Sequence, residues 1–228
     1  MTRPGLPFSD PAMVADYAAE TPRKVPGLAD LHRMTMLLLS ESAPGAAHVL
    51  VVGAGGGLEL RAMAAARPGW AFTGVDPSAA MLELARRTTE PFADRIELIE
   101  GTVDAAPAQP YDGATCLLTL HFLDRSERLR TLTEIHRRLK PGARLVMAHH
   151  GVPGDAAEPW LARSAAFAQR DEIDWPAARA SASAMAARLP LLSAGEEEAL
   201  LRSAGFRDAE LFYAAFSFRG WVATAGPA

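Results

Sequence analysis

Three short stretches carry side chains that together could bind a nucleoside ligand. Gly53, Gly55 and Gly57 are spaced as G-x-G-x-G directly after the apolar run at residues 49–52. A glycine turn after a strand lets a ligand approach the backbone without interference from a Cβ atom. Asp76 follows the next apolar run, and its carboxylate can accept hydrogen bonds from the two hydroxyls of a ribose.

The third stretch is Gly101-Thr102-Val103-Asp104, which follows another apolar run and could face an adenine ring. A fourth, Leu118 to Phe122, flanks the place where the reactive end of such a ligand would lie. Simpler interpretations stay open: the glycines could form only a tight turn, Asp76 could cap the helix that begins at Pro77, and residues 101–104 could form an ordinary turn.

The elements that must position these residues alternate between strand and helix patterns. Strands are expected at residues 49–52, 71–75, 95–100, 112–118 and 143–149, in repeats of a strand followed by a crossover, with helices after the first, second and fourth strands. This rhythm predicts an α/β fold with a parallel sheet covered on both faces. Residues 207–212 and 215–224 then predict a closing antiparallel hairpin at one edge.

The chain of 228 residues is interpreted as one domain. Residues 1–45 form an N-terminal helical lid, with a helix at 12–19 and a break at 21–27. Residues 46–149 form the ligand-binding core, and 150–193 form an alanine-rich helical insertion. Residues 194–228 supply the closing helix and hairpin.

The net charge, the cysteine content and the absence of long apolar runs argue against several classes of protein. The net charge of −4 argues against nucleic acid as a partner, and the charged cluster Arg125–Arg130 is interpreted as a solvated surface. Cys116 is the single cysteine, which suits a reducing compartment. We find neither a signal-peptide pattern nor a run long enough to span a membrane, so we expect a soluble cytoplasmic protein.

The ordered motifs of the chain resemble those of class I S-adenosyl-L-methionine (SAM)-dependent methyltransferases. The motifs are HVLVVGAGGGLEL, TGVDPSAAMLELAR, EGTVDAAP, YDGATCLLTLHFLD and LKPGARLVMA, and they cover residues 48–149. The resemblance implies a Rossmann-like methyltransferase fold, a doubly wound, mostly parallel sheet of seven strands, and SAM as cofactor. It implies that Gly53, Ala54 and Gly55 contact the methionine part of the cofactor and that Asp76 and Pro77 contact its ribose. It also implies that Met81, Thr102 and Val103 contact the adenine and that Leu118 lies near the sulfonium.

The N- and C-terminal segments are similar to those of the carboxy-S-adenosylmethionine synthase group. In that group the N-terminal segment closes over the cofactor, which implies that Tyr17, Arg23 and His32 lie near the active site. Tyr213, in the closing hairpin, is a further candidate for the pocket wall. The synthases hold an extra carboxylate with an arginine of the insertion. Neither Arg179 nor Arg188 is a convincing counterpart, which favours ordinary SAM.

A general base helps methyl transfer when the acceptor must lose a proton. His121 is our first candidate, with His149 and His150 also at strand ends, although each could be structural. His149 and His150 are adjacent on a strand and should point to opposite faces, so we expect no metal site. The residues therefore favour a methyltransferase acting on a small molecule, and the resemblance also allows a homodimer.

Three other functions stay open at this point. The first is a non-methylating enzyme that acts on SAM itself, such as a carboxylated-cofactor synthase or a cyclase. The second is a nicotinamide-dependent oxidoreductase, against which the G-x-G-x-G spacing and the closing hairpin both argue. The third is a module that binds the cofactor without turnover.

Overall fold

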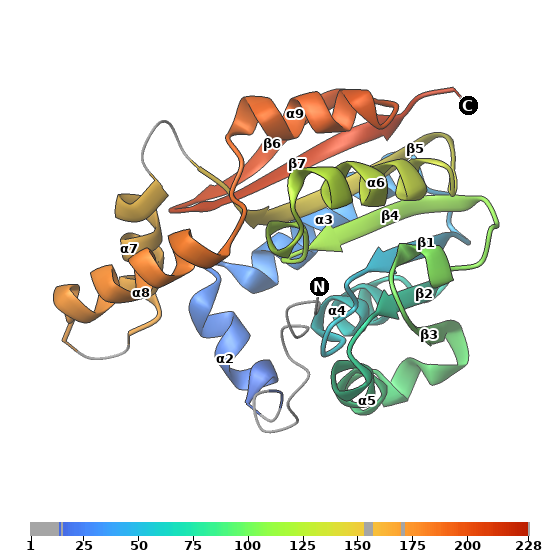
Figure 1. The fold of residues 1–228 in the computed structure, drawn as a ribbon. Helices are drawn as coiled ribbons and strands as arrows, with labels where there is room; N and C mark the ends of the chain where they lie inside the picture. Colours follow the sequence, from blue (N-terminus) through green and yellow to red (C-terminus); the bar gives the residue numbers. More distant parts are fainter. Residues whose placement is uncertain (1–13, 15, 153–156, 170–171, 228) are drawn as a thin grey trace.

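The computed structural model describes residues 14, 16–152, 157–169 and 172–227 and is organised around one sheet of seven strands (Figure 1). The strand order is β3-β2-β1-β4-β5-β7-β6, with β1 to β5 parallel and β7 and β6 antiparallel to their neighbours. The predicted doubly wound, mostly parallel sheet with its closing hairpin is therefore confirmed. The chain runs outward from β1 to β3 and then returns to β4, so the topological switch lies between β1 and β4.

The strands occupy the predicted stretches with small shifts at their ends. They are β1 (His48–Val52), β2 (Ala71–Asp76), β3 (Ile96–Glu100), β4 (Tyr111–Leu117), β5 (Leu139–His150), β6 (Phe206–Ala215) and β7 (Phe218–Ala225). β5 begins before Pro141-Gly142, where the sequence predicts a turn, because Leu139 already pairs with Tyr111 of β4.

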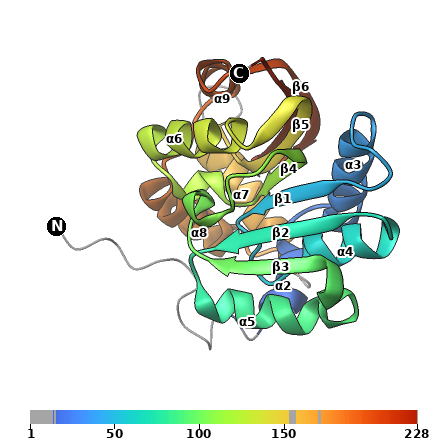
Figure 2. The same cartoon turned by 90° about the vertical axis from the view of Figure 1, so that its right-hand side faces the viewer.

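Helices cover both faces of the sheet (Figure 2). α3 (Leu28–Ser40), α4 (Leu58–Ala66) and α5 (Ala79–Thr88) lie on one face, and α6 (Arg125–His136) and α9 (Ala194–Ser203) lie on the other. Short 3₁₀ turns occur at Glu90–Arg95, Val103–Ala105 and Leu120–Phe122.

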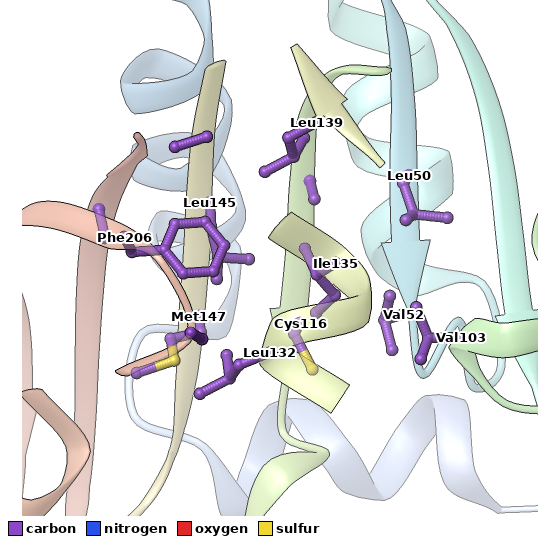
Figure 3. Close-up of a cluster of buried hydrophobic side chains, with 14 of the residues drawn as sticks. Leu50, Val52, Val103, Cys116, Leu132, Ile135, Leu139, Leu145, Met147 and Phe206 are labelled. Atoms are coloured by element: carbon purple, nitrogen blue, oxygen red, sulfur yellow. The ribbon is translucent and has the colours of Figure 1, made fainter. Parts of the chain in front are cut away.

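Alternate residues of the strands divide the core between the two faces. Leu50 and Val52 of β1 point toward α6 and α9, whereas Val49 and Val51 point toward α3 and α4. Figure 3 shows the first of these layers, in which Leu132 and Ile135 of α6 pack over the strands. The central strands β1 and β4 are buried on both faces, which explains their near-continuous apolar sequences, whereas the edge strands β3 and β6 are partly exposed.

The N-terminal segment differs from the prediction. The described helix is α2 (Tyr17–Lys24), so most of the predicted break at residues 21–27 is helical and contains Pro22. α2 ends at Lys24 because Val25 is extended, as expected for a residue that precedes a proline. Of the predicted helix at 12–19, residues 17–19 belong to α2, and residues 12, 13 and 15 lie outside the described residues.

The insertion contains α7 (Ala157–Phe167) and α8 (Trp175–Arg188), which pack against each other. α7 also packs against α2, so segments from both ends of the sequence meet beyond the carboxyl ends of the central strands (Figure 1). We call these strand ends the carboxyl edge of the sheet. Every described helix is too short or too polar to cross a lipid bilayer.

Candidate functional site

The glycine turn connects β1 to α4 at the topological switch. Gly53, Gly55 and Gly57 have φ angles of 76°, 51° and 80°, a backbone conformation that residues with a Cβ rarely adopt. A Cβ on Gly53 would lie 2.0 Å from Oγ1 of Thr119, so the turn touches the end of β4. The turn therefore brings the ends of β1 and β4 together at the place where ligands bind in doubly wound sheets.

Asp76 lies beside this turn and is 9% exposed. Its Oδ2 accepts a hydrogen bond from the N–H of Gly55 at 2.9 Å, and its Oδ1 accepts one from the N–H of Ser78 at 2.9 Å. Burial raises the pKa of the carboxyl, and these two backbone donors partly oppose that rise. Each carboxylate oxygen keeps a further lone pair, which suits the hydroxyls of a ribose.

The cap of α5 is Ser78 rather than Asp76. The Ser78 hydroxyl accepts a hydrogen bond from the N–H of Met81, and the helix begins at Ala79, two residues after Pro77. The simpler interpretation of Asp76, as the cap of a helix beginning at Pro77, is therefore wrong. Pro77 lies next to Asp76 and is partly exposed.

The expected adenine contacts lie on two neighbouring segments. Met81 is buried, and its Cε would lie 3.6 Å from a Cβ on Gly55. Thr102 is exposed and donates its hydroxyl to Asp104 at 2.7 Å, while the Val103 side chain belongs to the core. The Thr102 hydroxyl is thus already engaged, which leaves backbone groups of this turn for an adenine edge.

The end of β4 carries an unusual backbone conformation. Leu118 has a φ angle of 56°, in the left-handed region that non-glycine residues rarely occupy. Its N–H donates to the carbonyl of Ala148, and its side chain packs against an apolar cluster that includes Leu28 and Leu117. Strained residues of this kind are often found at functional sites, and this one lies where the reactive end of the ligand is expected.

Three histidines gather at the ends of β4 and β5. The ring centroid of His121 lies 5.1 Å from that of His150 and 6.4 Å from that of His149. Burial holds the pKa of His121 well below its usual range, and the neighbouring His150, His149 and Arg128 lower it further. His121 is therefore neutral at pH 7, and its buried Nδ1 has no hydrogen-bond partner among the described residues.

The two other histidines point to different partners. Nδ1 of His150 lies 2.7 Å from the hydroxyl of Ser217, which lies 2.7 Å from that of Ser164 in α7. Burial lowers the pKa of His150 to about 3. Nε2 of His149 lies 2.8 Å from Oε1 of Glu197 in α9. Among the described residues, no group of three His, Cys, Asp or Glu side chains is arranged to hold a metal ion.

Arg128 completes the network behind His149. Its guanidinium pairs with Glu197, and both side chains are 0% exposed. Its Nη2 also donates to the carbonyls of Leu123 and Pro190, which join α6 to the turn before it and to the insertion. The interpretation of Arg125–Arg130 as a solvated surface is therefore wrong for Arg128, although Arg125 is exposed.

Of the three lid residues that we predicted, Tyr17 is the one that lies against the glycine turn. A Cβ on Gly55 would lie 3.3 Å from the Tyr17 hydroxyl, so α2 covers the glycine turn. Arg23 pairs with Glu20 on the same helix. His32 in α3 is buried, which lowers its pKa to about 4.

Tyr213 ties the hairpin to the lid, because its hydroxyl donates to the carbonyl of Pro26 at 2.6 Å. We expect Tyr213→Phe to lower the free energy of unfolding by about 1 kcal/mol. It should also speed amide exchange at residues 25–28 in hydrogen-exchange mass spectrometry. Unchanged exchange there would contradict a role for this bond in holding the lid.

Some residues of the site have no clear signal in the sequence motifs. Glu59 of α4 is buried beside the glycine turn, and Glu197 of α9 is buried against His149. The burial of Arg128 could have been predicted from the sequence, because Arg128 shares the helical spacing of Leu132 and Ile135 on the buried face of α6. The roles that we predicted for individual site residues stay predictions, although the fold brings Asp76, the glycine turn, Leu118 and His121 to one edge.

The sequence is similar to a protein-family model and to several known proteins. Residues 49–142 match the family model described as a methyltransferase domain. A carboxy-S-adenosyl-L-methionine synthase of Chromohalobacter salexigens is 31% identical over 157 residues, which cover 67% of this chain and 58% of that protein. A demethylmenaquinone methyltransferase of Lactiplantibacillus plantarum is 40% identical over 84 residues, or 35% of each chain.

Solved structures share the fold at low sequence identity. A candidate O-methyltransferase from Nostoc punctiforme superposes with a TM-score of 0.71 at 23% identity, over 94% of this chain and 60% of that one. Human N-acetylserotonin methyltransferase, solved with SAM, gives 0.61 at 18% identity, over 94% and 59% of the two chains.

Family match and fold agree with each other. Residues 49–142 match a methyltransferase-domain model, and the chain shares its fold with solved methyltransferase structures. It spans 58% and 54% of the lengths of two carboxy-S-adenosyl-L-methionine synthases that it matches.

Proposed function

We propose that this protein transfers the methyl group of SAM to a small molecule, with His121 as the proton acceptor. The observation that carries the proposal is the placement of groups suited to a nucleoside along the carboxyl edge of the sheet. The glycine turn and Asp76 lie at one end of it, and the neutral, buried His121 lies beyond the end of β4.

The described residues fit the cofactor. Asp76 supplies free lone pairs for the ribose, and the glycines at residues 53, 55 and 57 leave those positions of the turn without a Cβ for the methionine tail. Met81 offers a buried apolar surface close to Gly55 for the adenine. SAM supplies a methyl group already activated by its sulfonium, so the protein must mainly align the acceptor with that carbon.

His121 would accept the proton that the acceptor loses. The bond from the acceptor atom to the methyl carbon forms as the bond from that carbon to sulfur breaks, and S-adenosylhomocysteine (SAH) leaves. The unpartnered Nδ1 of His121 can take the proton because the ring is neutral at pH 7. His150 and His149 contact this ring and fix its position.

The covering segments favour a compact acceptor. α2 and α7 pack against each other beyond the carboxyl edge, and Ser164 of α7 joins the hydrogen-bond chain to His150. A pocket covered in this way suits a small molecule better than a protein or a nucleic acid. The buried thiol of Cys116 suits a reducing compartment, and we place the enzyme in the cytoplasm.

A second candidate reaction is chemistry on SAM itself, which the similarity to carboxy-S-adenosyl-L-methionine synthases favours. Such chemistry needs a cation for the added carboxylate. Arg179 and Arg188 of the insertion are both exposed on α8. Methyl transfer therefore accounts for the described residues better.

We expect Asp76→Ala to weaken SAH binding by about 1.5–3 kcal/mol, or roughly 10- to 150-fold in Kd. The reason is the loss of two charge-assisted hydrogen bonds to the ribose. Isothermal titration calorimetry measures this, with the exposed Glu83→Ala as the matched control. Unchanged affinity in a folded Asp76→Ala protein would assign Asp76 a structural role only.

The proposed reaction is tested by incubating the protein with SAM that carries a labelled methyl group and with a set of small acceptors. Mass spectrometry should find the label on an acceptor and SAH as the coproduct. Consumption of SAM with the label retained on a modified SAM would instead support the second candidate reaction.

A further inference from the structure

Glu59 is a buried acid that the proposed reaction does not use. It is the second residue of α4 and is 6% exposed. Its Oε1 is buried and has no hydrogen-bond partner among the described residues. Burying a carboxylate without a hydrogen-bond partner lowers the stability of a protein. A ligand that supplies the missing partner would explain why such a group is present.

Glu59 lies in the buried layer between α4 and the sheet, near the glycine turn. Thr115 of β4 pairs in register with Val51 of β1, whose side chain faces α3 and α4. Thr115 therefore faces the same way as α4, and its Oγ1 is also buried without a partner in the described part of the chain. Two unpartnered oxygens thus lie below the glycine turn at the topological switch, where doubly wound sheets bind ligands.

In the described part of the chain, no cationic side chain is paired with this acid. Among the described residues, the titratable groups that Glu59 influences electrostatically are Tyr17 of α2 and Cys116 of β4, and Tyr17 is also influenced by Asp76. Burial raises the pKa of Glu59 to about 7, and the neighbouring Thr115 hydroxyl opposes that rise. The described residues therefore leave a place for a ligand cation next to the turn that Tyr17 covers.

We propose that Glu59 receives the α-ammonium group of the cofactor's amino-acid tail and releases a proton when the cofactor binds. The inference rests on the proposed function, because it takes SAM as the ligand. The ammonium is the fitting cation, since the glycine turn beside Glu59 lines the amino-acid tail. An arriving positive charge favours the ionised carboxyl, so binding lowers the pKa of Glu59.

The sign of the pH dependence follows from this shift. In the free protein Glu59 is protonated below pH 7 and ionised above it, whereas in the complex it is ionised. Its ionised fraction in the free protein rises from about 0.1 at pH 6 to about 0.9 at pH 8, so affinity should rise roughly tenfold over this range.

The experiment is calorimetric titration with SAH, which keeps the ammonium but lacks the sulfonium, in buffers of different ionisation enthalpy. Near pH 7 we expect release of about half a proton per SAH. 5′-Methylthioadenosine has no amino-acid tail and should release none. Glu59→Gln should also release none and bind SAH with equal affinity at pH 6 and pH 8.

The control is Glu198→Gln, which changes an exposed acid of α9 and should behave as the natural protein does. Proton release is measured on the natural protein with SAH and with 5′-methylthioadenosine. The proposal can therefore be tested even if the Glu59→Gln protein folds poorly. Tight SAH binding without proton release would overturn the role of Glu59 and leave the proposed function standing. Failure of SAH to bind at any pH would overturn both.

Discussion

Replacing Arg128 with methionine is expected to lower the free energy of unfolding by roughly 3–5 kcal/mol. Among the described residues, the substitution leaves the buried carboxylate of Glu197 with His149 as its one remaining partner, and both members of the ion pair are 0% exposed. It also removes donors to the carbonyls of Leu123 and Pro190. Urea denaturation followed by circular dichroism measures the loss.

The same two helices provide a matched control. Arg125 and Glu196 also join α6 to α9, but their side chains are 54% and 47% exposed. Arg125→Met should therefore cost less than about 1 kcal/mol. The double variant Arg128→Met/Glu197→Leu should regain much of the lost stability, because it removes both buried charges. A cost below 1 kcal/mol for Arg128→Met alone would contradict this account of the network.

Replacing His121 with asparagine is expected to lower kcat by roughly 10²- to 10⁴-fold, the usual contribution of a general base. The affinity for SAH should stay within about twofold, because His121 lies beyond the groups that hold the nucleoside. Burial keeps the pKa of His121 well below 6.5. In the natural protein at saturating cofactor, protonation of His121 should therefore cause no loss of kcat between pH 8 and pH 6.5.

His136→Asn is the control for that experiment, since His136 packs against Phe206 at the far end of α6. It should leave kcat within about twofold of the natural value. A His121→Asn protein that binds SAH and retains full kcat would show that this ring only supports the structure. The acceptor found by the labelled-methyl experiment serves as the substrate in both assays.

The sheet could be predicted from the sequence because burial on both faces leaves a simple pattern. The apolar run ending at Gly53 and the one ending at Asp76 could belong only to strands that enter turns. The closing hairpin was also recognisable from its two short runs. The N-terminal helix was not, because Pro22 suggests a break that packing against α3 and α7 overrides.

The site was less predictable than the sheet, since burial of charged groups leaves no mark on local composition. Arg128 stands among other arginines that are exposed, and only its helical phase relative to Leu132 separates it from them. Glu59 looks like an ordinary first-turn acid of a helix. Its partnerless position becomes visible only when Thr115 of a distant strand is placed beside it.

The central claim is that the crevice between β1 and β4 binds SAM, and calorimetry tests it most directly. Titrations with SAM, SAH and NAD at pH 7.5 compare the two candidate ligand classes under one condition. We predict saturable binding of SAM and SAH, weakened by Asp76→Ala, and no binding of NAD. Binding of NAD without binding of either sulfur ligand would contradict the claim.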